Sequence, residues 1–275
     1  MLNKAAPGKA VPVLLLWFVL IAVLHPFLWL LFSTIKPETE LMQYPPTFFP
    51  QELTFENYIQ VWESIPLLTL VKNTVIFSLG VAVTSVFFDS MAAYAFARIR
   101  FRGSRWMFTA ILITMMIPFQ VIMIPLFVEV YKLGLLDTFW GLILPRAGSA
   151  FGIFMMRSFF ISLPRELEES GRVDGFNEFM IYWRIMLPLC VPALITLGIF
   201  HFMGNWNDLL YPLMLTSSTE MRTLPAGLAM FVGDNTIEYG PTLAAAAISF
   251  LPLLILFLFA QKYFVQGVAT SGLKG

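Results

Sequence analysis

The sequence predicts an all-α membrane protein of six transmembrane helices, with a helix–Gly–helix loop on the cytoplasmic side. Three observations predict this class. Hydrophobic residues make up 58% of the 275 positions and charged residues 12%, about half the charged share of a soluble domain, and the mean hydropathy is +0.78. Six stretches hold roughly 20 apolar residues each, the length that crosses about 30 Å of hydrocarbon. Lys and Arg are also distributed unevenly between the segments that join these stretches.

The first apolar stretch, residues 11–32, is expected to remain in the protein. Lys4 and Lys9 precede it as basic residues precede a signal peptide, but the stretch is 22 residues long and lacks a clear small-x-small cleavage site. With it, residues 1–275 are expected to form a single transmembrane domain. The other expected spans lie near residues 73–97, 106–130, 138–160, 189–212 and 242–264.

Prolines interrupt the expected spans. Inside hydrocarbon, the backbone groups that a proline frees need partners in neighbouring helices or in a wet cavity, so kinked and moving helices are one interpretation. The other is that proline is simply more frequent in membrane helices. The positions are Pro26, Pro118, Pro125, Pro145, Pro192 and Pro252.

The orientation follows from the basic residues. An even number of spans places both chain ends on one side, and an excess of Lys and Arg marks the cytoplasmic side. Twelve Lys and Arg residues belong to the segments on the side of the termini and five to the opposite side, so both termini are expected in the cytoplasm. Two longer segments, residues 33–72 and 213–241, are then external, and Thr54 is expected to cap a short amphipathic helix in the first of them.

The second cytoplasmic segment, residues 161–188, is a compact charged island between two apolar regions. Ser162 and Pro164 are expected to begin a helix whose acidic first turn meets the positive end of the helix dipole. Gly175 is expected to end this helix, and Asn177 to cap a second, almost wholly apolar one. The acidic arm suits a docking surface for a basic groove, while the apolar arm must be buried. The alternative is a solvated loop whose charges serve solubility.

The spacing in this island resembles the cytoplasmic loop of the permease subunits of binding-protein-dependent ABC importers. That loop reads E-A-A, three residues, Gly, nine residues, Ile, one residue, Leu-Pro. The corresponding residues here are Glu169, Ser170 and Gly171, then Gly175, then Ile185, Leu187 and Pro188. Ser and Gly in place of two alanines keep the residues small, but the glycine costs about 1 kcal/mol of helix propensity.

Five further stretches resemble the carbohydrate-importer branch, in its shorter type, which is similar to the second permease of maltose and glycerol-phosphate systems. They are AAYAFARIRFRG at 92–103, IPLFVEVYKLGLLDTFWGLILP at 124–145, WNDLLYPL at 206–213, TLPAGLAMF at 223–231 and QKYFVQGVATSGLKG at 261–275.

The resemblance implies a heteromeric complex in a prokaryotic cytoplasmic membrane. Its partners would be a second permease subunit, two ATPase subunits, an external solute-binding protein, membrane lipid and a carbohydrate substrate. The charged island would be the coupling helix that sits in the ATPase cleft. The residues implied in ATPase coupling are Glu168, Glu169, Ser170, Gly171, Asp174, Gly175, Ile185, Leu187 and Pro188.

The sequence lacks the motifs of several catalytic classes. No G-x-x-x-x-G-K-[ST] loop occurs, so ATP and Mg²⁺ are expected on the partner ATPase, and no cofactor on this chain. No Ser–His–acid arrangement, Cys/His pair or H-E-x-x-H motif occurs either, which predicts a non-catalytic transport subunit. His25 and His201 are far apart in sequence and Cys190 is the single cysteine, so neither a metal nor a disulfide is expected. The zero net charge gives no support for nucleic-acid binding.

The main alternative is a stand-alone ion-coupled secondary transporter, which needs ionisable residues near the membrane midplane. Asp89 is the only acid deep in an expected span, and the sequence shows neither a partner for it nor an internal repeat. Asp89 is therefore interpreted as a hydrogen-bonded packing residue near the helix contacts of residues 91–96. An intramembrane enzyme, the other alternative, would need paired catalytic groups.

The fifth expected span carries a candidate face of the translocation path. On a helix of 3.6 residues per turn, five side chains lie within about 60° of one another, and the face becomes more polar towards its external end. Amide and carboxylate groups there suit a hydroxyl-rich solute. The alternative is that residues 205–208 only anchor and cap the span at the interface. The face consists of Leu194, Gly198, His201, Asn205 and Asp208.

Overall fold

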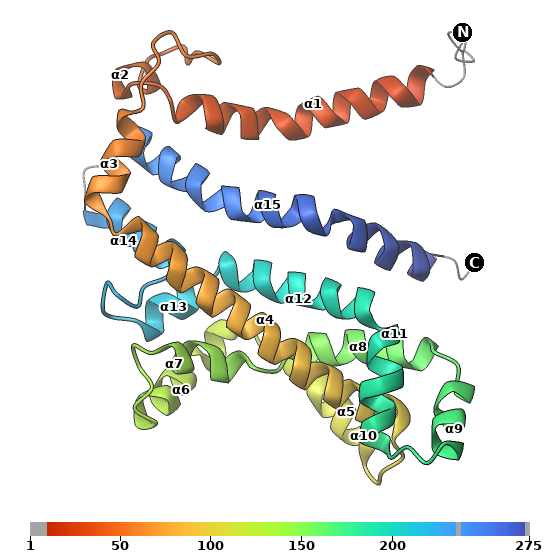
Figure 1. The fold of residues 1–275 in the computed structure, drawn as a ribbon. Helices are drawn as coiled ribbons and strands as arrows, with labels where there is room; N and C mark the ends of the chain where they lie inside the picture. Colours follow the sequence, from red (N-terminus) through yellow and green to blue (C-terminus); the bar gives the residue numbers. More distant parts are fainter. Residues whose placement is uncertain (1–9, 235–237, 273–275) are drawn as a thin grey trace. The chain divides into compact units, whose positions relative to one another are not determined.

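The computed structural model describes residues 10–234 and 238–272, and within them the regular structure is helical, without a strand (Figure 1). The first part of the chain forms α1 (Ala10–Ser33), α2 (Glu38–Leu41), α3 (Glu56–Ser64), α4 (Leu67–Arg98), α5 (Ser104–Thr114), α6 (Phe119–Lys132), α7 (Phe139–Ile143), the 3₁₀ turn η2 (Leu144–Arg146) and α8 (Ala150–Ser162). The second part forms α9 (Glu166–Val173), α10 (Glu178–Ile181), the π-helical segment η3 (Tyr182–Met186), α11 (Leu187–Leu189), α12 (Val191–Trp206), α13 (Leu210–Leu215), α14 (Leu224–Asp234) and α15 (Tyr239–Gly272). Lys4, Lys9 and the last three residues of the C-terminal motif lie outside the described residues.

The helices account for six crossings of a membrane, which confirms the predicted fold class. Three are long and apolar enough to cross alone, at Pro12–Ser33, Leu67–Arg98 and Tyr239–Phe259. Three more arise when each of three bent helix pairs is taken as one span. The pairs are Ser104–Thr114 with Phe119–Lys132, Phe139–Arg146 with Ala150–Ser162, and Glu178–Leu189 with Val191–Trp206.

The third expected span is not one continuous helix. The chain turns by 101° between α5 and α6, at Met115–Pro118. Pro118 has no backbone N–H to donate, and its ring disfavours helical geometry in the residue before it. Its extended backbone then starts α6 in a new direction. The expected span near residues 106–130 is therefore present as two helices with a sharp bend at one of the prolines that interrupt it.

The joint between α11 and α12 has a similar origin. The two helical stretches that meet at Cys190 differ in direction by 80°. Pro188 and Pro192 flank this cysteine, and each removes one backbone donor from the helical ladder. The preceding π-helical segment η3 widens the helix just where the ring of Pro188 would crowd the carbonyl four residues earlier.

The chain forms two compact units. The first comprises residues 1–67 and 228–252 and contains α2 and α3. In it the Asn57 amide donates to the carbonyl oxygens of Thr34 and Lys36, at 2.8 and 2.9 Å. The Glu38 carboxylate accepts from the first backbone N–H groups of α15, those of Tyr239 and Gly240, and so caps that helix.

The second unit comprises residues 68–227 and 253–275 and is built around α4. One apolar cluster packs α4 against α8, η3 and α12, with Met156, Phe160 and Leu197 fully buried. Another packs α4 against α6, α7 and α13 around Phe77 and Tyr211. Both candidate sites lie in this unit.

Candidate functional site

Polar side chains from five segments of the second unit, α12 among them, lie close together. We call this group the polar cluster. It consists of Asp89 of α4, Arg146 of η2, Ser149 before α8, His201 and Asn205 of α12, and Asp208 after α12.

Asp89 lies at the completely buried end of the polar cluster, which we call its inner end. Its carboxylate accepts hydrogen bonds from the backbone N–H of Ser149 at 2.6 Å and from the Ser149 hydroxyl at 2.9 Å. His201 Nε2 lies 3.1 Å from the same carboxylate, which is completely buried. Because Ser149 also caps α8 by accepting from Gly152 N, one carboxylate ties α4 to the start of α8 and to α12. A Cβ at Gly152 would lie 1.9 Å from the Asp89 carboxylate, so only glycine fits there.

Arg146 lies at the partly exposed end of the polar cluster, which we call its outer end. Its guanidinium donates to the Asn205 side-chain oxygen at 2.6 Å and lies 2.5 Å from the Asp208 carboxylate. It also lies over the Tyr211 ring, 3.9 Å from the centroid, in a cation–π contact. Asn205 in turn donates to the carbonyl oxygen of His201 at 2.7 Å, which joins the two ends of the cluster. Arg146 is 24% exposed and Asp208 19%, so this outer end remains accessible.

The structure brings together three of the predicted path residues and separates the others. His201, Asn205 and Asp208 belong to the polar cluster, whereas Leu194 and Gly198 line an apolar cavity of about 500 Å³ between α4 and α12. Asp208 also accepts from Tyr211 N at 3.1 Å, at the start of the following helix α13.

Sequence reasoning did not select three members of the polar cluster: Asp89, Arg146 and Ser149. The expectation that Asp89 has no ionisable partner is wrong, because His201 reaches it from 112 residues away. The Asp89 partners are Ser149 and His201, and not the helix contacts of residues 91–96. Arg146 is one of the five basic residues expected on the external side, and no role was predicted for it or for Ser149. One signal could have joined them: ionisable residues inside a membrane pair with one another.

The charged island forms the expected elbow, which we define as residues 166–188. Gly175 has φ +81°, and the N–H groups of Gly175 and Phe176 donate to the carbonyls of Arg172 and Gly171, which is the Schellman end of a helix. Asn177 then caps α10 by accepting from Met180 N at 2.8 Å. The first helix begins only at Glu166, because Ser162 still belongs to α8 and donates to Phe159 O. The expected start at Ser162 and Pro164 is therefore wrong.

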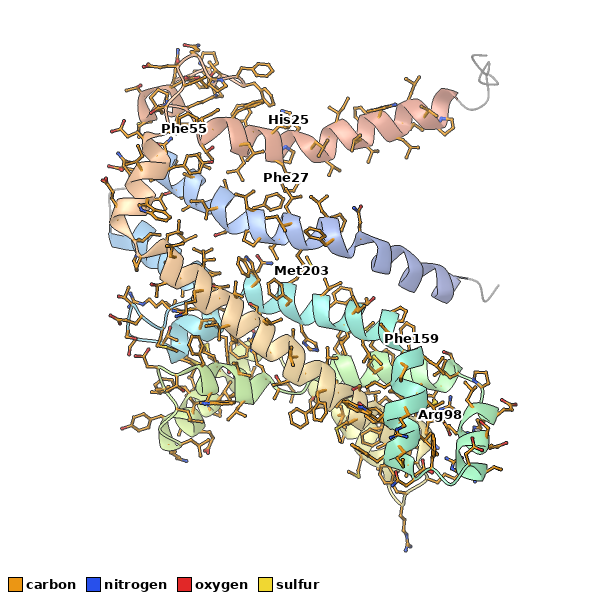
Figure 2. All side chains as sticks on the ribbon, in the orientation of Figure 1. His25, Phe27, Phe55, Arg98, Phe159 and Met203 are labelled. Atoms are coloured by element: carbon orange, nitrogen blue, oxygen red, sulfur yellow. The ribbon has the colours of Figure 1, made fainter. Side chains whose placement is uncertain are left out.

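Two charged side chains attach the elbow to α4 and α8. Arg98 Nε lies 3.0 Å from Glu168 Oε1, and the Arg98 guanidinium donates to the carbonyl oxygens of Phe160 and Leu163. Figure 2 labels Arg98 where α4 ends beside the elbow. Gly171 permits close packing, since a Cβ there would lie 2.7 Å from the Ile185 side chain.

A second set of contacts joins the two arms of the elbow. Arg172 Nε donates to Glu178 at 2.9 Å, and Tyr94 of α4 donates to the same carboxylate at 3.0 Å. A polar cavity of about 340 Å³ opens beside these groups and is lined by Arg98, Ile99, Arg100, Arg165, Glu168, Glu169, Arg172 and Glu178.

The elbow residues divide into inward and outward sets. Glu168 and Gly171 are buried within the chain, whereas Ile185 and Leu187 are half-buried. The outward face presents Glu169, Ser170, Val173, Asp174 and Gly175, with Pro188 exposed at the end of the second arm. Val173 is 87% exposed, and the spacing of the motif gave no reason to select it. Within the described residues, no three His, Cys, Asp or Glu side chains are placed to share a metal ion.

The comparisons with known proteins point to one group. Residues 86–270 match the family described as "Binding-protein-dependent transport system inner membrane component". The chain is 37% identical to the arabinooligosaccharides transport system permease protein of Halalkalibacterium halodurans, over 94% of each chain. It is 31% identical to the sulfoquinovosyl glycerol transport system permease protein of Agrobacterium fabrum, over 100% of this chain and 97% of the other. A solved chain from a bacterial ABC transporter involved in the import of the acidic polysaccharide alginate superposes with a TM-score of 0.80 and 27% identity, over 95% of this chain and 99% of that one.

Proposed function

The chain belongs to the family of binding-protein-dependent transport system inner membrane components, and from this premise we propose that it is the non-catalytic permease subunit of an ATP-driven sugar importer. It is a multi-pass membrane protein with six crossings. The named relatives support a saccharide as the transported solute. Sugar hydroxyls both donate and accept hydrogen bonds, and so match the amide, guanidinium and carboxylate groups of the polar cluster.

The elbow is the proposed docking site for a separate ATPase subunit. The observation that carries this proposal is the division of its residues. Arg98 and Glu168 fix the elbow to the bundle and Gly171 lets its two arms pack closely, while Glu169, Val173 and Asp174 face outwards. Two acids beside an exposed apolar side chain suit a groove with basic walls and an apolar floor. ATP and Mg²⁺ would be held by the ATPase.

The polar cluster is proposed to line part of the path, which this chain would share with a second permease subunit. Its outer end is the accessible one, and it contains three kinds of hydrogen-bonding group next to one another. An external solute-binding protein would deliver the sugar to this side. The excess of basic residues on the other side supports cytoplasmic termini. Cysteine labelling in intact cells tests this orientation, and external labelling at position 100 or 170 would contradict it.

Co-purification and reconstitution test the proposed function together. The tagged chain, expressed with the genes that adjoin its own, should retain a P-loop ATPase and a second permease. Reconstituted vesicles should then take up an oligosaccharide only with ATP and the binding protein. Isolation of the chain alone, or uptake without the ATPase, would refute the proposal.

The buried Asp89 and His201 pair favours one other function, an ion-coupled secondary transporter, since such proteins use intramembrane acids and histidines. Uptake by the chain alone, driven by a proton or sodium gradient, would identify it. Loss of ATP-independent uptake in Asp89→Asn would then assign the coupling site.

A further inference from the structure

We propose that α4 transmits movement of the elbow to the polar cluster, with Ser90 and Tyr94 as the positioning residues. This inference rests on the proposed function of the elbow as the ATPase docking site. It concerns the route by which movement inside this chain reaches the transported solute.

The C-terminal half of α4 holds the elbow at three points. Arg98 is paired with Glu168 on the first arm. Tyr94 donates to Glu178 at 3.0 Å, at the start of the second arm. The Ser90 hydroxyl lies 2.8 Å from the Tyr182 hydroxyl, and both are buried. Each contact therefore has one partner on α4 and one on the elbow.

The same helix holds the polar cluster one turn further towards its N-terminus. Ser85 donates to the carbonyl oxygen of Arg146 at 2.7 Å, and Asp89 binds Ser149 and His201. Residues four apart lie above one another on a helix, so the pair 85 and 89 forms one row and the set 90, 94 and 98 a neighbouring row. Asp89 and Ser90 are adjacent in the chain. The two rows therefore meet within a single turn.

The covalent route between elbow and polar cluster is bent, whereas α4 is continuous. The second arm of the elbow continues into α12, but the chain turns by 80° at Cys190 between them. A π-helical segment and two prolines weaken the backbone ladder there. By contrast α4 runs for 32 residues without a proline. A displacement of the elbow can thus be absorbed at the joint, but it must move α4 if the three side-chain contacts hold.

The contacts have the strength that such a role requires. Ser90, Tyr94 and Tyr182 are all at most 3% exposed, so bulk water has little access to their hydroxyls, while the Glu178 side chain that accepts from Tyr94 is 44% exposed. A buried hydroxyl left without a partner is unfavourable in a low-dielectric setting. The pairs therefore stay together when one side moves.

The test uses conservative removal of single hydroxyls in the reconstituted complex. The variants are Ser90→Ala, Tyr182→Phe, their double variant, and Tyr94→Phe. Tyr58→Phe is the matched control, since its half-buried hydroxyl bonds to Thr34 at 2.9 Å in the other unit. The readouts are ATPase retained on the purified complex, ATP hydrolysis stimulated by the loaded binding protein, and sugar taken up per ATP hydrolysed.

The expected result is a lower coupling ratio in an intact complex. Sugar taken up per ATP should fall by about fivefold in Ser90→Ala, in Tyr182→Phe and in Tyr94→Phe, the scale of one lost buried hydrogen bond. The double variant should be no worse than either single one, because both remove the same contact. Tyr58→Phe should match the wild type.

Two results would overturn the inference. One is an unchanged ratio in Tyr182→Phe and Tyr94→Phe. The other is a reduced yield of complex whose assembled fraction still couples normally, which would make the contacts structural only. Absence of the ATPase from the wild-type complex would instead refute the proposed function. The ATPase retained on the wild-type complex is therefore measured before any variant is compared.

Discussion

The Arg98 guanidinium lies 3.0 Å from the Glu168 carboxylate, and both side chains are almost completely buried. Arg98 Nε and Glu168 Oε1 attract each other by charge, and their alignment does not meet the geometry of a hydrogen bond. A charge buried in this way depends on its partner, so the pair fixes the elbow on the bundle and leaves Glu169 and its neighbours free to face outwards. Five predictions follow from this and the other contacts.

Glu168→Gln should destabilise the chain strongly. The change leaves Arg98 buried without a counter-charge, and loss of one partner from a buried pair costs about 3–5 kcal/mol. The measurement is thermal unfolding of the purified complex in detergent. Glu129→Gln is the control, since its pair with Lys132 is exposed on both sides and should contribute little. Equal melting temperatures for the two variants would contradict the prediction.

Gly175→Val should impair the elbow through backbone geometry alone. The residue has φ +81° with no atom within 4 Å of an added Cβ, so strain of about 1–2 kcal/mol is the expected effect. Gly175→Asn should be milder, because asparagine tolerates this region. Gly103→Val is a close control at φ +84° with equally open surroundings. Only the variant at position 175 should lower ATPase association in a pull-down assay.

Glu169→Lys should abolish ATPase association without affecting the fold. The side chain is exposed, so the substitution reverses a charge on the proposed docking face and disturbs no buried contact. Glu63→Lys, at an exposed position in the other unit, should leave association unchanged. Transport at the wild-type rate with the ATPase bound would show that this face is not the docking site.

Asp208→Asn separates the two roles of this residue. Asparagine can still accept from Tyr211 N and cap α13, but it cannot balance the charge of Arg146. Sugar uptake should then need a higher concentration for half-maximal rate, while the yield of complex stays normal. Asp208→Ala should also raise the concentration needed for half-maximal uptake, and in addition it should lower the yield of complex. If Asp208→Asn transports normally and only the alanine variant loses yield, the residue is a cap and not part of the path.

Acid should loosen the elbow through Glu178. The Glu178 carboxylate pairs with Arg172 and accepts from Tyr94, so protonation of this carboxylate in acid removes the charge that holds the pair together. The melting temperatures of the wild type and Glu178→Gln should therefore differ at pH 6 and converge towards pH 3. A difference that persists at pH 3 would assign the stability to shape and not to charge.

The sequence was sufficient for features with a local cause. Gly175 and Asn177 act within a few residues of themselves, so the end of one helix and the start of the next followed from residue type. The six spans could also be predicted, because each depends on the apolar composition of its own segment. The helix start at Glu166 was displaced because the preceding span ran further than its apolar composition indicated.

The polar cluster could not be assembled from the sequence because its contacts are long-range. Asp89 meets residues 60 and 112 positions away, and Arg146 meets Asn205 across 59 positions. Helix periodicity placed His201, Asn205 and Asp208 on one face of the fifth span, but it does not indicate which residues of other helices meet that face. Pro118 marked an interruption of the third span, but the residue type alone does not give the 101° angle, because proline both kinks and ends helices.

The position of Cys190 has a practical consequence for labelling chemistry. It is the single thiol of the sequence and lies buried at the joint between α11 and α12. A thiolate must be exposed to react with a maleimide, so the natural sequence already serves as the unreactive background for introduced cysteines. Any reaction at Cys190 itself during turnover would report directly that this joint has opened.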